Sequence, residues 1–192
     1  QNYNCVPHFV HNAGAATKWQ QGMASAGASL ALPIQWCYAA PTDVLASTEM
    51  RAVTNLRVST DFCYGRSWDI GISSLIVWAA GAAPSKDTLW STTNGRYEVP
   101  GCNWTPDHES PAVPLHIMLA LMSTGPVGIS DMIGHVNASV VIPAITKTGV
   151  LLKPSKPVTT IESLLLKPEA GTQILGTFGV GPSWYFVSFL VD

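Results

Sequence analysis

An arginine and an aspartate stand four residues apart in the stretch NLRVSTDFCYG, as Arg57 and Asp61. They follow a run rich in β-branched residues, which is typical of a strand. An aspartate at the end of a strand can act as a general acid and base if its pKa is high enough to hold a proton near the working pH. A direct ion pair with Arg57 would lower that pKa. The spacing alone leaves two interpretations open: a catalytic Asp61, or an ion pair that closes the strand.

Polar and aromatic side chains also lie at the ends of the other predicted strands. Gln35 and Trp36 end one strand, Trp90 ends another, and Asp131 follows a third. A tryptophan ring can stack on a sugar face, but a tryptophan is more often part of the core. Gln35 could bond a sugar hydroxyl. Asp131 could accept a hydrogen bond from a ligand or a neighbouring group, or it could cap the helix predicted to follow it.

The histidines and cysteines do not indicate a metal site. His8 and His11 stand three residues apart without a third ligand nearby in the sequence, and none of the four cysteines belongs to a CxxC pair. The glycine-rich stretch GTFGVGPS precedes a predicted strand, so it lacks the helix N-terminus that binds phosphate. We therefore predict neither a metal nor a cofactor.

The elements that must position these residues alternate between strands and helices. The pattern predicts parallel strands, in this spatial order, at residues 33–38, 53–59, 87–91 and 126–130. It predicts helices at residues 16–31, 41–52, 67–83, 111–124 and 135–146. This alternation is that of a (β/α)8 TIM barrel, in which active sites form at the carboxyl ends of the strands. Four units make half a barrel, which would leave two sheet edges open.

The last part of the chain has a different pattern. From Gly149 onward, Pro and Gly separate β-rich runs, and SWYFVSFLVD (residues 183–192) is the clearest strand. We therefore assign residues 1–148 to half of an α/β barrel, and the resemblance described below implies that this is its second, C-terminal half. Residues 149–192 are assigned to the start of a C-terminal antiparallel β domain.

Composition restricts the classes of partner. The 192 residues are 11% charged and 47% hydrophobic, with a formal charge of −2. This charge gives no reason to expect a nucleic-acid partner, and the apolar stretches are shorter than the about 20 residues that span a membrane. The scarcity of charge is typical of a piece of a larger globular protein. Sequons at Asn103 and Asn137, with the absence of basic runs, favour a secreted or lumenal glycoprotein.

Five segments stand in a distinctive order between about residues 30 and 155: PIQWCYA, NLRVSTDF, DTLWST, LHIMLALMSTGPVGISDMIGH and GVLLKP. Together they resemble the second half of the catalytic barrel in the α-galactosidase and raffinose-synthase group of retaining glycoside hydrolases. In that group an R-x-x-x-D motif follows the sixth strand, and its aspartate is the general acid and base. The motif matches Arg57 and Asp61. The last barrel strand of the group matches STGPVGISD, which ends in Asp131, and a C-terminal β-sandwich follows.

The resemblance implies a retaining glycosidase that acts on a carbohydrate substrate, with or without transglycosylation. Such enzymes use two carboxyl groups, one as nucleophile and one as acid and base. The resemblance gives Asp61 the role of acid and base. We therefore expect Arg57 to bind a sugar hydroxyl and to make no direct ion pair with Asp61. The other substrate-binding candidates are Gln35, Trp36, Trp90 and Asp131.

The chain departs from this group at the nucleophile. The nucleophile of the group is an aspartate at the end of the fourth strand, upstream of PIQWCYA, but residues 1–42 contain no Asp or Glu. We therefore expect a fragment, a chain completed by a separate half-barrel chain, or an inactive site. The alternative function is a non-catalytic carbohydrate-binding or structural extracellular protein on the same scaffold.

Overall fold

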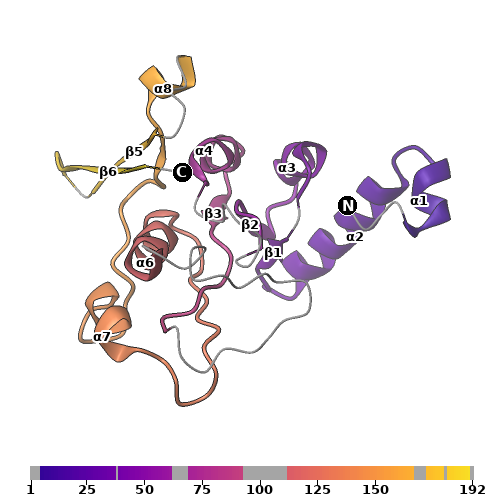
Figure 1. The fold of residues 1–192 in the computed structure, drawn as a ribbon. Helices are drawn as coiled ribbons and strands as arrows, with labels where there is room; N and C mark the ends of the chain where they lie inside the picture. The colour runs from indigo at the N-terminus through magenta and orange to yellow at the C-terminus, as the bar shows by residue number, and fades with distance from the viewer. Residues whose placement is uncertain are drawn as a thin grey trace.

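Three short parallel strands form the sheet at the centre of the N-terminal part of the molecule (Figure 1). They are β1 (Ile34–Trp36), β2 (Val53–Arg57) and β3 (Ala83–Ser85), in the order β1-β2-β3. The computed structural model describes residues 5–37, 39–61, 69–92, 112–166, 172–179 and 181–190. Because all three strands run in the same direction, their carboxyl ends lie at one edge of the sheet.

Helices α3 (Pro41–Ser47) and α4 (Gly71–Ala79) connect the strands and lie on one face of the sheet (Figure 1). α3 begins at a proline, whose fixed φ suits a first helical turn. Asp43 accepts a hydrogen bond of 2.8 Å from the backbone N–H of Ala40, which satisfies one donor at this end. The core between these helices and the sheet is made by Ala24, Trp36, Val44, Met50, Val53, Leu56, Val77 and Ala82.

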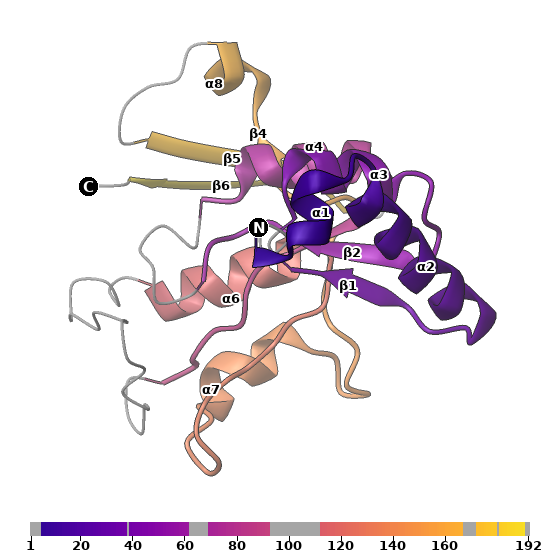
Figure 2. The ribbon, with the colours of Figure 1, turned by 90° about the vertical axis from the view of Figure 1, so that its right-hand side faces the viewer.

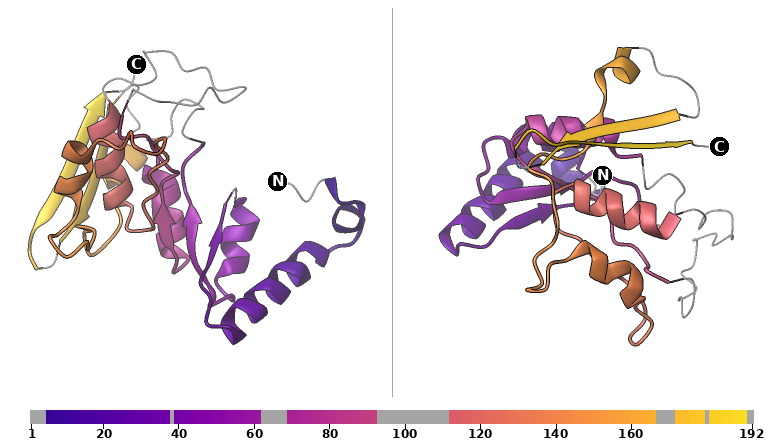
Figure 3. Two further views of the ribbon diagram at one scale, coloured as in Figure 1. Left: turned by 90° about the horizontal axis from the view of Figure 1, so that it is seen from below. Right: turned by 90° about the vertical axis from the view of Figure 1, so that its left-hand side faces the viewer.

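Two helices precede the sheet, α1 (Pro7–His11) and α2 (Ala15–Ser29), and they extend from it as an arm (Figure 3). α2 confirms the helix predicted at residues 16–31. Gln20, buried on α2, donates a hydrogen bond of 2.7 Å to Asp43 of α3. This bond holds α2 against α3.

The third strand differs from the prediction. The sequence pattern predicts a helix through residue 83 and a strand at 87–91, but α4 ends at Ala79 and β3 is Ala83–Ser85. Gly81, with a φ of 85°, turns the chain directly after α4, so the strand begins earlier. β2 does pair in parallel with the strand that follows it, but that strand is Ala83–Ser85 and not the predicted 87–91. Leu89 then makes an isolated parallel bridge with Ile129, which continues the expected strand order.

A close approach of two backbones positions this fourth segment. Thr124, with a φ of 69°, follows α6 (Ala112–Met122) and turns the chain toward the sheet. The N–H of Gly125 then donates a hydrogen bond of 2.9 Å to the carbonyl of Pro84. A β-carbon on Gly125 would collide with that same carbonyl and with Ser85, so only glycine fits here.

The helix predicted at residues 135–146 is shorter than expected. It consists of α7 (Ala138–Val141) followed by the 3-10 turn η2 (Ile142–Ala144). Pro143 lacks a backbone N–H, so it cannot continue a regular helix. The core beneath this segment is made by Leu89, Ile117, Ala120 and Ala144.

The C-terminal part forms an antiparallel sheet, as the sequence predicts. Its strands are β4 (Thr159–Thr160), β5 (Thr172–Phe178) and β6 (Trp184–Leu190), in the order β4-β5-β6. α8 (Glu162–Leu166) follows β4 in the chain and lies outside the sheet (Figure 2). The sheet shares a core with the N-terminal part. That core is made by Ile70, Leu119, Val158 and Leu175.

The fold is therefore of mixed α/β class, with one parallel and one antiparallel sheet of three strands each. Within the described ranges, the parallel strands do not close into a barrel. None of the helices described here is both long enough and apolar enough to cross a membrane.

Candidate functional site

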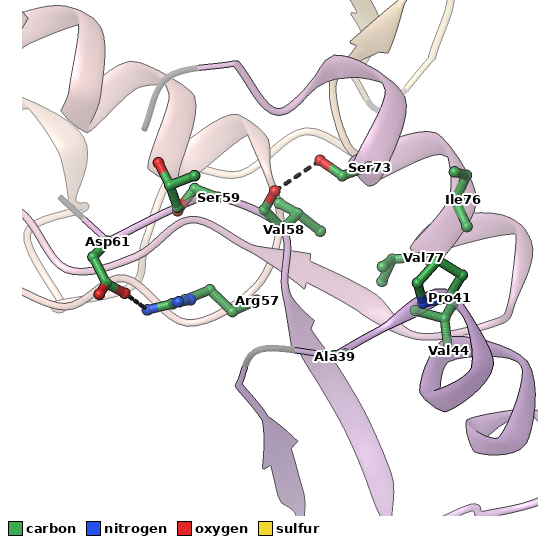
Figure 4. A pocket seen from close by; sticks show the side chains of 11 residues that line it. Ala39, Pro41, Val44, Arg57, Val58, Ser59, Asp61, Ser73, Ile76 and Val77 are labelled. Atoms are coloured by element: carbon green, nitrogen blue, oxygen red, sulfur yellow. Dashed lines mark hydrogen bonds and ion pairs between the residues drawn. The ribbon is translucent and has the colours of Figure 1, made fainter. Parts of the chain in front are cut away.

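Arg57, the last residue of β2, is in contact with two carboxylates. Its Nη1 lies 2.6 Å from Oδ1 of Asp61 and 3.4 Å from Oδ1 of Asp87. The Arg57 side chain is 7% exposed, whereas those of Asp61 and Asp87 are 28% and 19% exposed. The guanidinium is therefore buried, and both carboxylates remain accessible to a ligand. Figure 4 shows the Arg57–Asp61 pair at one end of a pocket.

The ends of two neighbouring strands bring these carboxylates together. Directly after β2, the N–H of Val58 donates a hydrogen bond of 2.9 Å to the carbonyl of Ser85. The Ser59 hydroxyl then accepts a hydrogen bond of 2.8 Å from the N–H of Asp87. Because one guanidinium nitrogen contacts both Asp61 and Asp87, the two contacting oxygens lie at most about 6 Å apart.

The direct ion pair corrects one expectation. The resemblance predicts that Arg57 binds a sugar hydroxyl and does not pair with Asp61, yet the two side chains are in contact. A buried guanidinium is costly without a charged partner, which explains why it takes the nearest carboxylates. The contact also favours the ionised form of the Asp61 carboxyl. The observed geometry is therefore that of the alternative interpretation, an ion pair that closes the strand.

Two buried basic side chains lie near this cluster: Lys86 beside Asp87, and His116 near Lys86. Burial lowers the pKa of the Lys86 ammonium from 10.5 to about 7, and the negative charge of Asp87 opposes this shift. Burial also lowers the pKa of His116, on α6, to about 3, with a smaller contribution from the positive charge of Lys86. His116 is therefore neutral at physiological pH.

A pocket of about 510 Å³ extends from the Arg57–Asp61 pair between α3 and α4 (Figure 4). Its polar end is formed by the residues that follow β2, and its other end by apolar side chains of the two helices. The lining residues are Ala39, Pro41, Val44, Arg57, Val58, Ser59, Thr60, Asp61, Ser73, Ile76 and Val77. Sequence reasoning did not anticipate this pocket, because its walls come from helices whose packing the pattern does not specify.

Gln35 and Trp36 lie on different sides of the sheet. Gln35 is exposed, and its Nε2 donates a hydrogen bond of 3.3 Å to Oγ of Ser85. Asn55 donates to the same oxygen at 2.8 Å, so polar side chains form a row across the three strands. Trp36 points the other way and belongs to the core against the helices. The structure does not bring Trp36 to the site, because alternate residues of a strand face opposite sides.

Asp131 lies after the segment that pairs with Leu89, and its carboxylate binds the loop beyond Leu89. It accepts hydrogen bonds from the N–H of Ser91 at 2.9 and 3.0 Å, from the Ser91 hydroxyl at 2.7 Å, and from the N–H of Thr92 at 3.1 Å. These bonds join the ends of two parallel segments. The helix that follows is capped by Asn137, not by Asp131. Trp90, half-buried, lies within the same loop.

The two sequons differ in what the structure describes. Asn137 is exposed, and its Oδ1 accepts hydrogen bonds from the N–H of Ser139 at 3.2 Å and from the Ser139 hydroxyl at 2.7 Å. Asn103 lies outside the described residues. An exposed Asn137 is compatible with modification but does not test it.

Sequence reasoning missed Asp87, Lys86 and His116. Asp87 was taken as the first residue of a strand, although it follows the strand β3. A shorter helix ending before Gly81 would have placed Asp87 at a strand end, where site residues were expected. Burial of Lys86 and His116 gave no signal in the sequence.

The comparisons with known proteins add no family. The chain matches no model of a known protein family, and a search of curated proteins gives no significant match.

Within the part of the chain that the structure describes, no group of three or more His, Cys, Asp or Glu side chains is arranged to hold a metal.

Proposed function

We propose that this chain is the C-terminal half of the barrel of a retaining glycoside hydrolase of the α-galactosidase type, with or without transglycosylation. In this proposal Asp61 is the general acid and base. The nucleophile comes from the remainder of the barrel, either upstream in the same polypeptide or in a separate chain. The protein is secreted or lumenal, and Asn137 carries a glycan.

The observation that supports the proposal most is the cluster of Arg57, Asp61 and Asp87. Its residues lie at or just beyond the carboxyl ends of two adjacent parallel strands, where the active sites of α/β barrels form. Asp61 is partly exposed and borders a pocket, so a substrate can reach its carboxyl group. Asp87 adds a second negative charge beside the same guanidinium, and this charge opposes the stabilisation of ionised Asp61 by Arg57.

The chemistry proposed for Asp61 has two steps. In the first, Asp61 gives its proton to the glycosidic oxygen as the bond from that oxygen to the anomeric carbon breaks, and the nucleophile carboxylate bonds to that carbon. In the second, water attacks the anomeric carbon, its proton goes to Asp61, and the nucleophile leaves as a carboxylate. Both carboxyl groups return to their starting forms.

The direct Arg57–Asp61 ion pair favours a second candidate, a non-catalytic carbohydrate-binding or structural extracellular protein. A carboxylate whose partner is a buried guanidinium can serve as a fixed structural charge without any proton transfer. The two candidates differ in whether Asp61 must carry a proton, and a nearly isosteric substitution separates them.

The test is Asp61→Asn in the native protein that contains this chain. We expect hydrolysis of natural α-galactosides to fall by roughly 10²–10⁴-fold, because the amide cannot supply a proton. Activated aryl glycosides should lose less in the first step, and added azide should restore turnover by attacking the intermediate directly. Steady-state kinetics with and without azide provide the measurement.

Asp69→Asn is the matched control, because Asp69 is exposed and does not line the pocket. It should leave the kinetics unchanged. Unchanged turnover in Asp61→Asn, or the absence of any glycosidase activity in the native protein, would favour the non-catalytic candidate. Intact mass of the native material tests the other half of the proposal, since a half-barrel enzyme requires a longer chain or a bound partner.

A further inference from the structure

We propose that the pocket between α3 and α4 holds the leaving group of the substrate, and that this leaving group is an alkyl or aryl group and not a sugar. This inference rests on the proposed function. It adds a substrate class to it: glycosides of apolar alcohols, in place of oligosaccharides.

The position of Asp61 places the leaving group in this pocket. A general acid must come within about 2.6–3.2 Å of the oxygen that it protonates. In a glycoside, that oxygen joins the sugar to the leaving group, so the leaving group begins beside Asp61. Asp61 itself lines the pocket, at its polar end (Figure 4).

The wall beyond Asp61 offers little to a sugar. It consists of apolar side chains from α3, from the residue just before its start region, and from α4: Ala39, Pro41, Val44, Ile76 and Val77. The hydroxyl of Ser73 is already bonded to the carbonyl of Val58, at 2.8 Å, and to that of Ile70, at 3.1 Å. A sugar in this place would lose hydrogen bonds to water without equivalent replacements, which is unfavourable. An alkyl or aryl group gains by leaving water.

The pocket has the size for such a group. Its volume of about 510 Å³ lies within the roughly 300–1,000 Å³ usual for small-molecule sites. Ile76 remains 51% exposed at its mouth, so the pocket presents an apolar surface that a ligand can cover. Arg57 and Asp61 at the opposite end orient the polar part of the ligand.

The experiment compares three α-D-galactosides with the native protein: the octyl glycoside, the methyl glycoside and raffinose, whose leaving group is a disaccharide. We expect kcat/KM for the octyl glycoside to exceed that for the methyl glycoside at least tenfold, since each buried methylene adds to binding. The octyl glycoside, used below its micelle concentration, should also exceed raffinose.

Ile76→Ser tests the apolar wall directly. It should lower kcat/KM for the octyl glycoside by roughly three- to tenfold and change that for raffinose much less, because it removes mainly apolar contact. Ile72→Ser is the matched control: Ile72 is also on α4 and 55% exposed, but it does not line the pocket. Both variants lose an exposed isoleucine from the same helix, so a general effect on α4 would appear in both.

Three outcomes overturn the inference. Raffinose could be the better substrate, or the two serine variants could lose the same activity, and in both cases the proposed function would stand. Hydrolysis of none of the three glycosides would overturn the proposed function, and the assignment of a leaving group with it.

Discussion

Arg57 illustrates how one buried side chain determines the local charge. It holds Asp61 and Asp87 at the ends of two strands, while Lys86 next to Asp87 is almost fully buried. The site therefore carries charges of both signs in a small, partly dehydrated volume. In such surroundings the charged groups lose more hydration free energy than the charges of an ion pair at the surface do.

The buried Lys86 predicts a pH dependence of stability. Its pKa is about 7 in the folded protein and about 10.5 in the unfolded chain. Between these values the unfolded chain binds more protons, so the free energy of unfolding should rise with pH. Below pH 7 Lys86 is protonated in both the folded and the unfolded chain, so burial of its charge lowers the free energy of unfolding by the full amount.

Lys86→Met should remove this part of the pH dependence. The stability of the variant relative to wild type should be greatest near pH 7 and should decline toward pH 10, as measured by urea denaturation. Lys147→Met, at an exposed turn, controls for the loss of one positive charge. A difference between Lys86→Met and wild type that stays constant from pH 7 to pH 10 would contradict the prediction.

At this scale, sequence reasoning identified part of the site. The R-x-x-x-D spacing led to Arg57 and Asp61, and a strand end does place them together. The spacing left an Arg57–Asp61 ion pair as only one of two interpretations, because the preference of a guanidinium among several partners depends on burial. Asp87 was missed because its role depends on where β3 ends, and element boundaries are set by packing as well as by pattern.

Among the elements, the turn from α6 into the sheet has a strict local requirement for glycine. Gly125 passes so close to Pro84 and Ser85 that a side chain has no room. The segment cannot move away without losing the hydrogen bond from Gly125 to Pro84. The register of this segment against β3 therefore depends on a single glycine.

Gly125→Ala should lower the free energy of unfolding by about 1–3 kcal/mol, as other overpacking substitutions do. Gly22→Ala is a control of opposite sign. Gly22 lies within α2 with open space around its α-carbon, so alanine there should stabilise by about 0.5–1 kcal/mol. Thermal unfolding of both variants would check the pair, and a Gly125→Ala protein as stable as wild type would show that the backbones can separate freely.

The alternation of strands and helices was predictable because it follows from local hydrophobic periodicity. The position of β3 was not, since Ala82 and Ala83 suit a helix as well as a strand. The decisive residue was Gly81, whose positive φ ends the helical region. Pro143, which lacks a backbone N–H, shortened the last predicted helix, at residues 135–146.

Over the whole molecule, the two sheets are joined by a common core. Val158 and Leu175 of the C-terminal part pack with Ile70 and Leu119 of the N-terminal part, and all four are buried. The sequence indicated two regions of different pattern but not their contact, because the docking of sheets on helices involves residues far apart in the chain. Parts that share a core should unfold together.

Leu175→Ala should therefore destabilise the whole chain, by about 3–5 kcal/mol, in a single transition. Leu166→Ala, at a leucine 75% exposed on α8, should change stability much less. Far-UV circular dichroism and tryptophan fluorescence should give coincident melting curves for wild type. Two separate transitions, of which Leu175→Ala shifts only the earlier, would mean that the sheets fold independently.

The position of β6 has a consequence for the protein in concentrated solution. In the described part of the chain this strand is the margin of its sheet, and its sequence WYFVSFL contains neither a charge nor a proline. Two of its own side chains, Trp184 and Phe186, are mostly exposed. Natural edge strands usually carry charged residues or a proline, which hinder the addition of a strand from another molecule. When residues 1–192 are purified alone, we therefore expect slow ordered aggregation at a rate that rises steeply with protein concentration.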